Sequence, residues 1–401
     1  PDTPPMKKSY SGPEWKKMMY EEVKIELANE LIRELTVLPN TNTSGLTSPP
    51  QVIRKPTNKR IFSEYKTKEQ ANEQTNEQMS NSIVQPQNTK KPKTIYGTLK
   101  PPLFQLQEKE KWLQHLKTEG YVVIKDIISD NVNSKATALF KQEWTTVSPE
   151  FKWNDVGTWT TTNSPMVWSK SSAMFNGFGQ SKFMWFLRTQ PTIHKAFEHI
   201  FGTGELATSL DGFSVFLSPK QKSPNWLHQD QRAQDTRKSV QGIVNLKPVD
   251  KDDAGFVCVP KSHMTHKPKS SKKDWVMLDT NDPHYPKAVK LLIPENCLTL
   301  WHSKTIHSNT GMSTKHPLKL HLNRLSTYIT MAPKNRQTPE IVKRRKEGYK
   351  QGESCSHWVG RHEVKKIPFH LKSRYAKRKF NDLVPELDGN GNIPDKYAKL
   401  I

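Results

Sequence analysis

The stretch Trp226-Leu227-His228-Gln229-Asp230 decides how this chain is interpreted, together with Leu300-Trp301-His302-Ser303-Lys304-Thr305-Ile306-His307-Ser308-Asn309 further along. His228 and Asp230 are two positions apart, so on an extended strand both side chains point to one face. A histidine from the second stretch, His302 or His307, would add another imidazole. Two neutral imidazoles and one carboxylate form a facial set that suits Fe(II) and leaves coordination positions open. For His228 and Asp230 alone, a hydrogen-bonded surface pair is the alternative interpretation.

The residues around these stretches predict an all-β core. Residues 239–249 and 252–263 contain short apolar runs with β-branched residues, separated by a charged turn. Such runs are typical of sequential strands. Residues 208–217 alternate between apolar and polar and predict the strand that precedes the His-x-Asp pair.

Several motifs resemble, in order and spacing, the phytanoyl-CoA dioxygenase family of Fe(II)/2-oxoglutarate oxygenases. They are the strand-like residues 119–126, His228-x-Asp230, the strand 242–249, the run 255–263, the segment 301–309 and the strand 324–333. The resemblance covers about residues 103–360. It implies a mainly β fold with flanking helices, built on a double-stranded β-helix or jelly roll with iron at its open end.

The resemblance also implies the metal ligands. The family's Trp-x-Ser-x-x-x-His pattern matches Trp301 to His307, so His307 is the expected third ligand beside His228 and Asp230. These three residues would then form the metal-binding and catalytic centre. His302 takes a supporting position next to the metal.

Arg324 is the residue that we expect to bind 2-oxoglutarate, because a guanidinium stays charged and binds a carboxylate through two parallel hydrogen bonds. Ser326 lies on the same strand face and would add a hydrogen bond. Arg324 is further from His307 than is usual in the family, so Lys319 is the fallback cation.

The function that the resemblance implies is that of a 2-oxoglutarate-dependent non-haem iron dioxygenase. It would use Fe(II), 2-oxoglutarate and O2, release succinate and hydroxylate an unidentified substrate, for which the basic charge of the chain favours an anionic molecule. The alternative is a basic, nucleic-acid-associated binding or structural protein on a jelly-roll scaffold, with little or no turnover. Zinc hydrolase chemistry is disfavoured because no general-base glutamate sits beside the ligands.

Composition and charge bear on partners and compartment. The 401 residues carry a net charge of +23, with a pI near 9.7 and 33% hydrophobic residues. Such a charge attracts polyanions, nucleic acid among them, but it also serves solubility. Three cysteines without a paired spacing argue against a disulfide framework. No apolar run of about 18 residues is present. We therefore expect a soluble intracellular protein, cytoplasmic or nuclear, without a membrane span.

The chain divides into four expected regions. Residues 1–39 contain an amphipathic helix over 14–38, which either docks on the catalytic domain or binds a protein partner. Residues 40–100 are polar and basic and predict a flexible linker. Residues 101–335 are the expected dioxygenase domain, and residues 336–401 a basic C-terminal extension.

Within the dioxygenase domain the apolar periodicity predicts helices over 105–117, 131–144 and 183–201. We expect a strand over 121–128 and an irregular, basic excursion over 264–285. Residues 354–358, Ser-Cys-Ser-His-Trp, resemble an element that follows the barrel in some members of the family, and the sequence gives it no physical role.

Overall fold

The computed structural model describes residues 96–165, 172–173, 177–217, 226–267, 274–313, 320–365, 383 and 385–401. The predicted helix over 14–38 and almost all of the predicted linker lie outside these residues. The same is true of Lys319 and of the whole basic segment 366–382.

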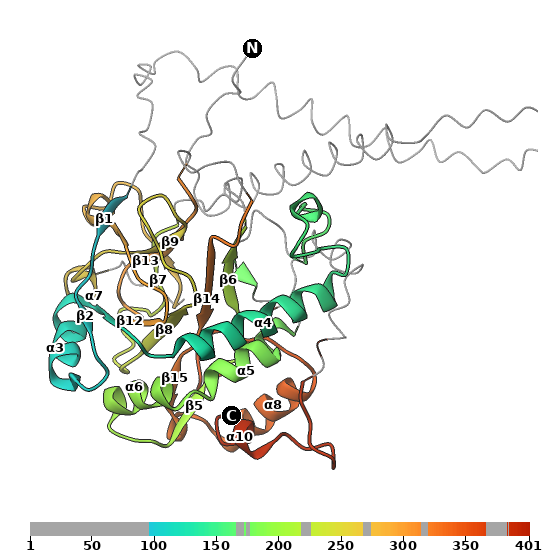
Figure 1. Cartoon of the computed structure of the whole chain (residues 1–401). Helices are drawn as coiled ribbons and strands as arrows, with labels where there is room; N and C mark the ends of the chain where they lie inside the picture. The colour runs from blue at the N-terminus through green and yellow to red at the C-terminus, as the bar shows by residue number, and fades with distance from the viewer. Residues whose placement is uncertain are drawn as a thin grey trace, which may run out of the picture. The chain divides into compact units, whose positions relative to one another are not determined.

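Two mixed sheets dominate the described part of the chain (Figure 1). The first contains, in spatial order, β1 (Gly97–Leu99), β11 (Val289–Leu291), β9 (Gly255–Cys258), β13 (His307–Thr310), β7 (His228–Gln229) and β10 (Val276–Met277). The second contains β2 (Leu103–Phe104), β3 (Tyr121–Ile124), β12 (Cys297–His302), β8 (Val240–Asn245), β14 (Arg324–Tyr328), β6 (Phe213–Phe216) and β4 (Ser172–Ala173). A small separate pair joins β5 (Leu206–Thr208) to β15 (Met331–Pro333).

The connectivity of these strands is that of a double-stranded β-helix. Consecutive strands alternate between the two sheets from β6 to β9, and again from β11 to β14. Neighbours are antiparallel except for β1 with β11 and β2 with β3. The predicted fold class, mainly β with flanking helices on a jelly-roll core, is confirmed.

Alternation along the strands gives the second sheet two different buried faces. On β12, Leu298 and Leu300 belong to the large cluster that also contains helix residues. Cys297 and Trp301 instead pack with Phe256 of the first sheet. The second face therefore looks into the space between the sheets, and we call it the inner face.

Helices α3 (Lys109–Glu119), α4 (Asp130–Val147), α5 (Lys182–Arg188) and α6 (Pro191–Phe201) cover the outer face of the second sheet, because their buried side chains share a cluster with Leu298 and Leu300. The other described helices are α7 (Ser262–Thr265), α8 (Pro339–Lys350) and α10 (Asp395–Ala398), and the short 3-10 turns are η2 (Val156–Thr158), η3 (Phe178–Gln180), η4 (Tyr285–Lys287) and η5 (Lys334–Arg336). Figure 1 shows α4 and α5 side by side, and Phe140 and Phe183 of these helices pack on Phe213 of β6. Ser129 caps α4 by accepting a hydrogen bond from the backbone N–H of Val132.

The C-terminal region, predicted as a basic extension, packs on this helical layer. Tyr349 of α8 and Tyr397 of α10 contact Trp185 of α5, and Ile401 belongs to the same buried cluster. Among the helices that the structure describes, none has the length and apolar character needed to cross a membrane.

Three local predictions are corrected by the structure. The single helix expected over 183–201 is two helices, because Pro191 has no N–H to donate and starts a new helix at its first position. The strand expected over 121–128 ends at Ile124, and Asp126 then adopts a positive φ of 52°. The excursion over 264–285 is not wholly irregular, because its strand β10 pairs with β7.

Candidate metal centre

His228, Asp230 and His307 come together at one end of the space between the sheets. β7 and β13 are neighbours, and His228 is paired directly with His307. The Nε2 atom of His228 lies 3.5 Å from Oδ1 of Asp230, and Nε2 of His307 lies 3.2 Å from Oδ2. All three ligand atoms lie within 4.8 Å of one another. Ligand atoms at about 2.1 Å from one ion are roughly 3 Å apart, so the cluster fits a single metal ion.

Backbone carbonyls fix the tautomer of both histidines. Nδ1 of His228 lies 2.8 Å from the carbonyl oxygen of Trp226, and Nδ1 of His307 lies 2.9 Å from that of Thr305. A carbonyl oxygen only accepts, so each Nδ1 carries the proton and donates it. In its neutral form each imidazole would then present the lone pair of Nε2 to the shared site, as a metal ligand must.

Asp230 is held by Ser303 of the Trp-x-Ser-x-x-x-His pattern and by Gln241, which the sequence did not single out. Its backbone N–H donates to the carbonyl of Ser303, and Gln241 Nε2 donates to Oδ2 at 3.0 Å. The same Gln241 nitrogen lies 3.2 Å from Ser303 Oγ, which in turn contacts Ser239 Oγ at 2.8 Å. This network leaves Oδ1 directed at His228 and orients the carboxylate for a metal.

The charges of the three residues are strongly coupled. Burial alone would raise the pKa of Asp230, but the interaction with His228 and the hydrogen bond from His307 outweigh it and hold this pKa well below its ordinary value. Burial lowers the pKa of His307, and the nearby His228 lowers it further. The centre therefore combines an ionised carboxylate with a neutral His307, the protonation states in which these groups bind a cation.

Arg324 and Ser326 lie on the inner face of the second sheet, because Ser326 pairs with Asn245 of β8 and Tyr328 pairs with Ile243. Arg324 is 1% exposed, and its Nε and Nη1 atoms have no hydrogen-bond partner among the described residues. The same holds for Ser326 Oγ and Asn245 Oδ1. Burial lowers the pKa of Arg324 to about 10. Buried polar groups without partners mark a place where a small polar ligand would complete the hydrogen bonds.

A cavity of about 530 Å³ opens onto the three residues. Its walls include aromatic side chains from several segments, namely Trp226, Phe256, Trp275, Trp301, Tyr328 and Trp358. Tyr328 accepts a hydrogen bond from Asn309, two positions after His307, and lies on the same strand face as Arg324. Tyr328 and Arg324 thus lie on one face of β14, with Tyr328 in the cavity wall and Arg324 buried further along the strand.

Two further cavity residues were not expected from the sequence. Asp211 is 5% exposed, and burial raises the pKa of its carboxyl to about 6. His357 belongs to the Ser-Cys-Ser-His-Trp element, and burial lowers its pKa to about 4, so its imidazole is neutral. The sequence pointed to His357 only through its place in the Ser-Cys-Ser-His-Trp element, to which no role could be assigned.

His302 lies apart from the cavity. Its ring stacks on His263 with centroids 5.0 Å apart, and it lines a different surface pocket together with Lys238. The structure therefore brings His307, and not His302, to His228 and Asp230.

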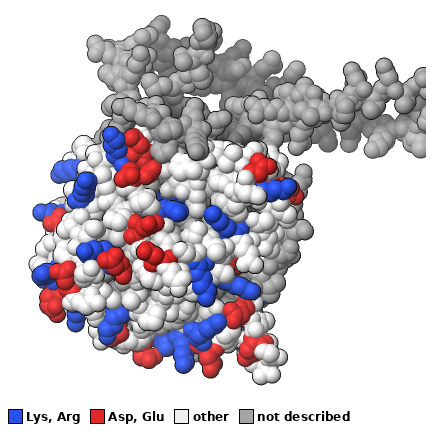
Figure 2. All heavy atoms as spheres, in the orientation of Figure 1, with Lys and Arg blue, Asp and Glu red and all other residues white. Residues whose placement is uncertain are grey.

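The surface charge is mixed where the structure describes it. Figure 2 shows Lys and Arg interspersed with Asp and Glu on the face in view. Much of the positive charge lies elsewhere in the sequence, since residues 366–382 alone contain six Lys or Arg against one Asp. Nucleic-acid binding through a basic surface stays a prediction.

Comparisons with known proteins give distant similarities. No family model matches the chain. The Ava biosynthesis cluster protein O of Aspergillus versicolor is 24% identical over 262 residues, which is 59% of this chain and 81% of that protein. Among solved structures, the chain is similar to the non-heme alpha ketoglutarate dependent epimerase SnoN from nogalamycin biosynthesis, at 18% identity and a TM-score of 0.37, over 57% of this chain and 84% of that one. It is also similar to HygX from Streptomyces hygroscopicus with nickel and 2-oxoglutarate bound, at 14% identity and a TM-score of 0.39, over 56% and 86% of the two chains.

Proposed function

We propose that this chain is an Fe(II)/2-oxoglutarate-dependent dioxygenase that hydroxylates a substrate held in the cavity above His228, Asp230 and His307. The observation that carries the proposal is the combination of this cluster with a buried guanidinium on the adjoining inner face, two of whose nitrogens have no partner among the described residues. With Fe(II), 2-oxoglutarate and O2 bound, such a centre couples decarboxylation of 2-oxoglutarate to succinate with oxidation of a C–H bond. Two groups of residues can be assigned to two requirements of that chemistry.

The first requirement is a metal that keeps open positions. Two imidazoles and one carboxylate occupy one face of an ion and leave the others to cosubstrate and oxygen. The donor set is hard enough for Fe(II) and contains no thiolate, since Cys258 and Cys297 are buried in the core between the sheets. Burial raises the pKa of both thiols to values at which they stay protonated.

The second requirement is a buried cation for the distal carboxylate of 2-oxoglutarate. The buried Nε and Nη1 atoms of Arg324 have no hydrogen-bond partner among the described residues and can donate to an anionic carboxylate, and Ser326 Oγ lies on the same face to add a hydrogen bond. Burying a guanidinium in this way destabilises the ligand-free protein. Such a buried cation is expected of an anion site that is formed before its ligand binds.

Cosubstrate turnover tests the proposal. Purified protein is supplied with Fe(II), 2-oxoglutarate and air, and succinate is followed over time. We expect slow succinate release without added substrate, lost in His228→Ala. His194→Ala is the matched control, because His194 lies on α6 in a separate surface groove.

Absence of succinate and of oxygen uptake from folded, iron-loaded wild type would overturn the proposal. That result would favour the alternative of a jelly-roll binding protein without turnover. Equal succinate from wild type and His228→Ala would show that free iron, and not this centre, drives the reaction.

A further inference from the structure

Residues 354–365 form a hairpin that reaches the mouth of the cavity. Cys355 pairs with Val364 in an antiparallel bridge, and the N–H of Lys365 donates to the carbonyl of Ser354. The base of the hairpin is tied to the body of the protein, because Ser354 Oγ accepts from the N–H of Gly179 at 2.8 Å. The tip of this hairpin carries His357, Trp358 and Arg361 to the cavity wall.

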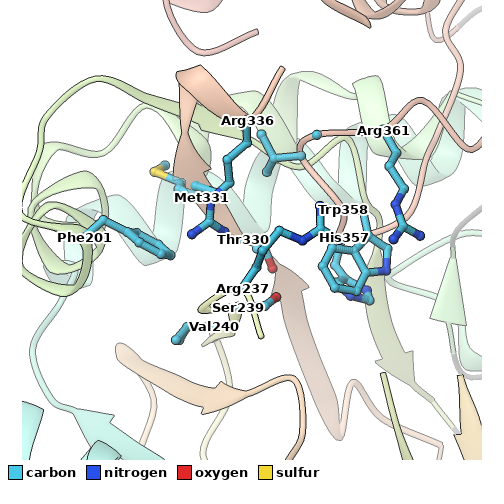
Figure 3. Close-up of a pocket in the computed structure, with 13 residues that line it drawn as sticks. Phe201, Arg237, Ser239, Val240, Thr330, Met331, Arg336, His357, Trp358 and Arg361 are labelled. Atoms are coloured by element: carbon cyan, nitrogen blue, oxygen red, sulfur yellow. The ribbon is translucent and has the colours of Figure 1, made fainter. Parts of the chain in front are cut away.

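The tip is held in a defined position by two arginines. Trp358 lies between the guanidinium groups of Arg237, at 5.7 Å, and Arg361, at 4.7 Å (Figure 3). Arg237 is paired with Asp235, and Arg361 donates to Asp274 at 2.7 Å. Arg361 therefore links the hairpin to the opposite wall, where Trp275 follows Asp274.

That opposite wall is apolar and open. Trp275 and Met277 are 48% and 43% exposed, although large apolar side chains are usually covered. Met277 pairs with His228 across β10 and β7, so both side chains, and that of Trp275, lie on the same face. The ring of Trp275 lies 5.7 Å from that of His228. An apolar surface thus continues directly from the metal ligands to the solvent.

His357 supplies a polar group opposite this surface. Its Nε2 atom is buried and has no hydrogen-bond partner among the described residues. The small pocket on its other side, shown in Figure 3, measures about 20 Å³ and has room for little more than one water molecule. His357 also lines the cavity, which of these two spaces is the one large enough for a substrate.

The charges in the wall do not favour a polyanion. Arg361 is neutralised by Asp274 and Glu363, and Lys365 shares the cavity with Asp211. An aromatic wall with one neutral imidazole instead suits a flat apolar molecule with a single polar substituent. This differs from the anionic substrate that the net charge of the sequence suggested.

We propose that the substrate is a flat, largely apolar small molecule that lies against Trp275 and Trp358 and forms a hydrogen bond to His357 through an oxygen substituent. The inference deepens the proposed dioxygenase function, on which it rests. It assigns His357 a substrate-binding role and makes the hairpin a specificity element.

A pair of probe molecules isolates the hydrogen bond. 2-Naphthol and 2-methylnaphthalene have nearly the same shape, but only the first has a hydroxyl. Their affinities are measured by calorimetry on the full chain with Fe(II) and 2-oxoglutarate under anaerobic conditions, and again without iron. We expect wild type to prefer 2-naphthol by about five- to tenfold, the value of one hydrogen bond.

Variants then assign the preference to its residues. His357→Phe should remove the preference, and His357→Gln should restore part of it. Trp275→Ala should weaken both probes by roughly tenfold and leave their ratio unchanged. His194→Ala, outside the cavity, should behave as wild type in both respects.

The outcomes separate this inference from the proposed function. Equal affinities in wild type, a preference that survives in His357→Phe, or displacement of 2-naphthol by a DNA duplex would each overturn the inference. A preserved 2-naphthol preference in a protein that gives no visible iron–2-oxoglutarate band would support the binding site and overturn the dioxygenase function.

Discussion

Replacement of Arg324 by methionine should stabilise the ligand-free protein and abolish tight 2-oxoglutarate binding. Two donor atoms of Arg324 are buried and have no partner in the part of the chain that the structure describes, and each such atom costs about 1–3 kcal/mol. The same penalty is visible in the pKa of Arg324, which burial lowers from 12.5 to about 10, equivalent to roughly 3 kcal/mol against the charged form. We therefore expect Arg324→Met to raise the free energy of unfolding by roughly 1–3 kcal/mol.

The effect on the cosubstrate has the opposite sign. A carboxylate that loses a hydrogen-bonded guanidinium partner in a buried site loses about 2–5 kcal/mol, which is roughly 30-fold to several thousandfold in affinity. Urea unfolding of the ligand-free protein gives the first quantity. Anaerobic calorimetry with Fe(II) and 2-oxoglutarate gives the second.

Arg188 offers a matched control for this variant. It is equally buried, but Nη1 donates to the carbonyl of Gly179 and Nη2 to that of Asp211. Arg188→Met should therefore lose about 2–4 kcal/mol of stability. If Arg324→Met lost as much stability as Arg188→Met and kept its affinity for 2-oxoglutarate, Arg324 would be a structural residue and the assignment would be wrong.

Three further predictions concern the support of the metal, pH and nucleic acid. Gln241→Leu removes the donor to Asp230 and should weaken Fe(II) binding by roughly 10- to 100-fold, measured by competition with a chelator; unchanged affinity would show that Asp230 needs no such support. Burial lowers the pKa of His302 and His357 to about 4, against 6.5 for an ordinary histidine, so the unfolded chain binds more protons in this range. The free energy of unfolding of the ligand-free protein should then fall as pH drops from about 6.5 to 4, by up to about 1.4 kcal/mol per pH unit for each imidazole. In urea unfolding at several pH values, His302→Asn should reduce the slope of this free energy against pH. An unchanged slope would contradict the lowered pKa of His302. If the basic sequence binds nucleic acid, affinity for a DNA duplex must fall steeply between low and physiological salt, and no binding at low salt would remove that prediction.

The strands that follow His228 were predicted from nearly local sequence patterns, whereas the choice of His307 over His302 came from the family resemblance. A His-x-Asp pair at strand spacing needs only the two-residue period, and the apolar runs after it mark the next strands. Two imidazoles on neighbouring strands then meet because β7 and β13 pair. The break at Pro191 was equally local, and the apolar periodicity across it concealed the start of a second helix.

Such local patterns could not predict the cavity, because its walls come from segments that are distant in the sequence. Trp275 belongs to a region that looked irregular, and it became a wall only through the pairing of β10 with β7. His357 lies on a hairpin that is tied to the body of the protein by a hydrogen bond between Ser354 and Gly179, and these two residues are distant in the sequence. Gln241 faces Asp230 from another strand, and nothing in its own neighbourhood marks it.

The most direct test of the central claim is the visible spectrum of the anaerobic protein with Fe(II) and 2-oxoglutarate, recorded for wild type, His307→Ala and His302→Ala. The account predicts a weak charge-transfer band in wild type that is retained in His302→Ala and lost in His307→Ala, because only His307 faces Asp230 and His228. No band in folded wild type, or a band that survives in His307→Ala and disappears in His302→Ala, would contradict it.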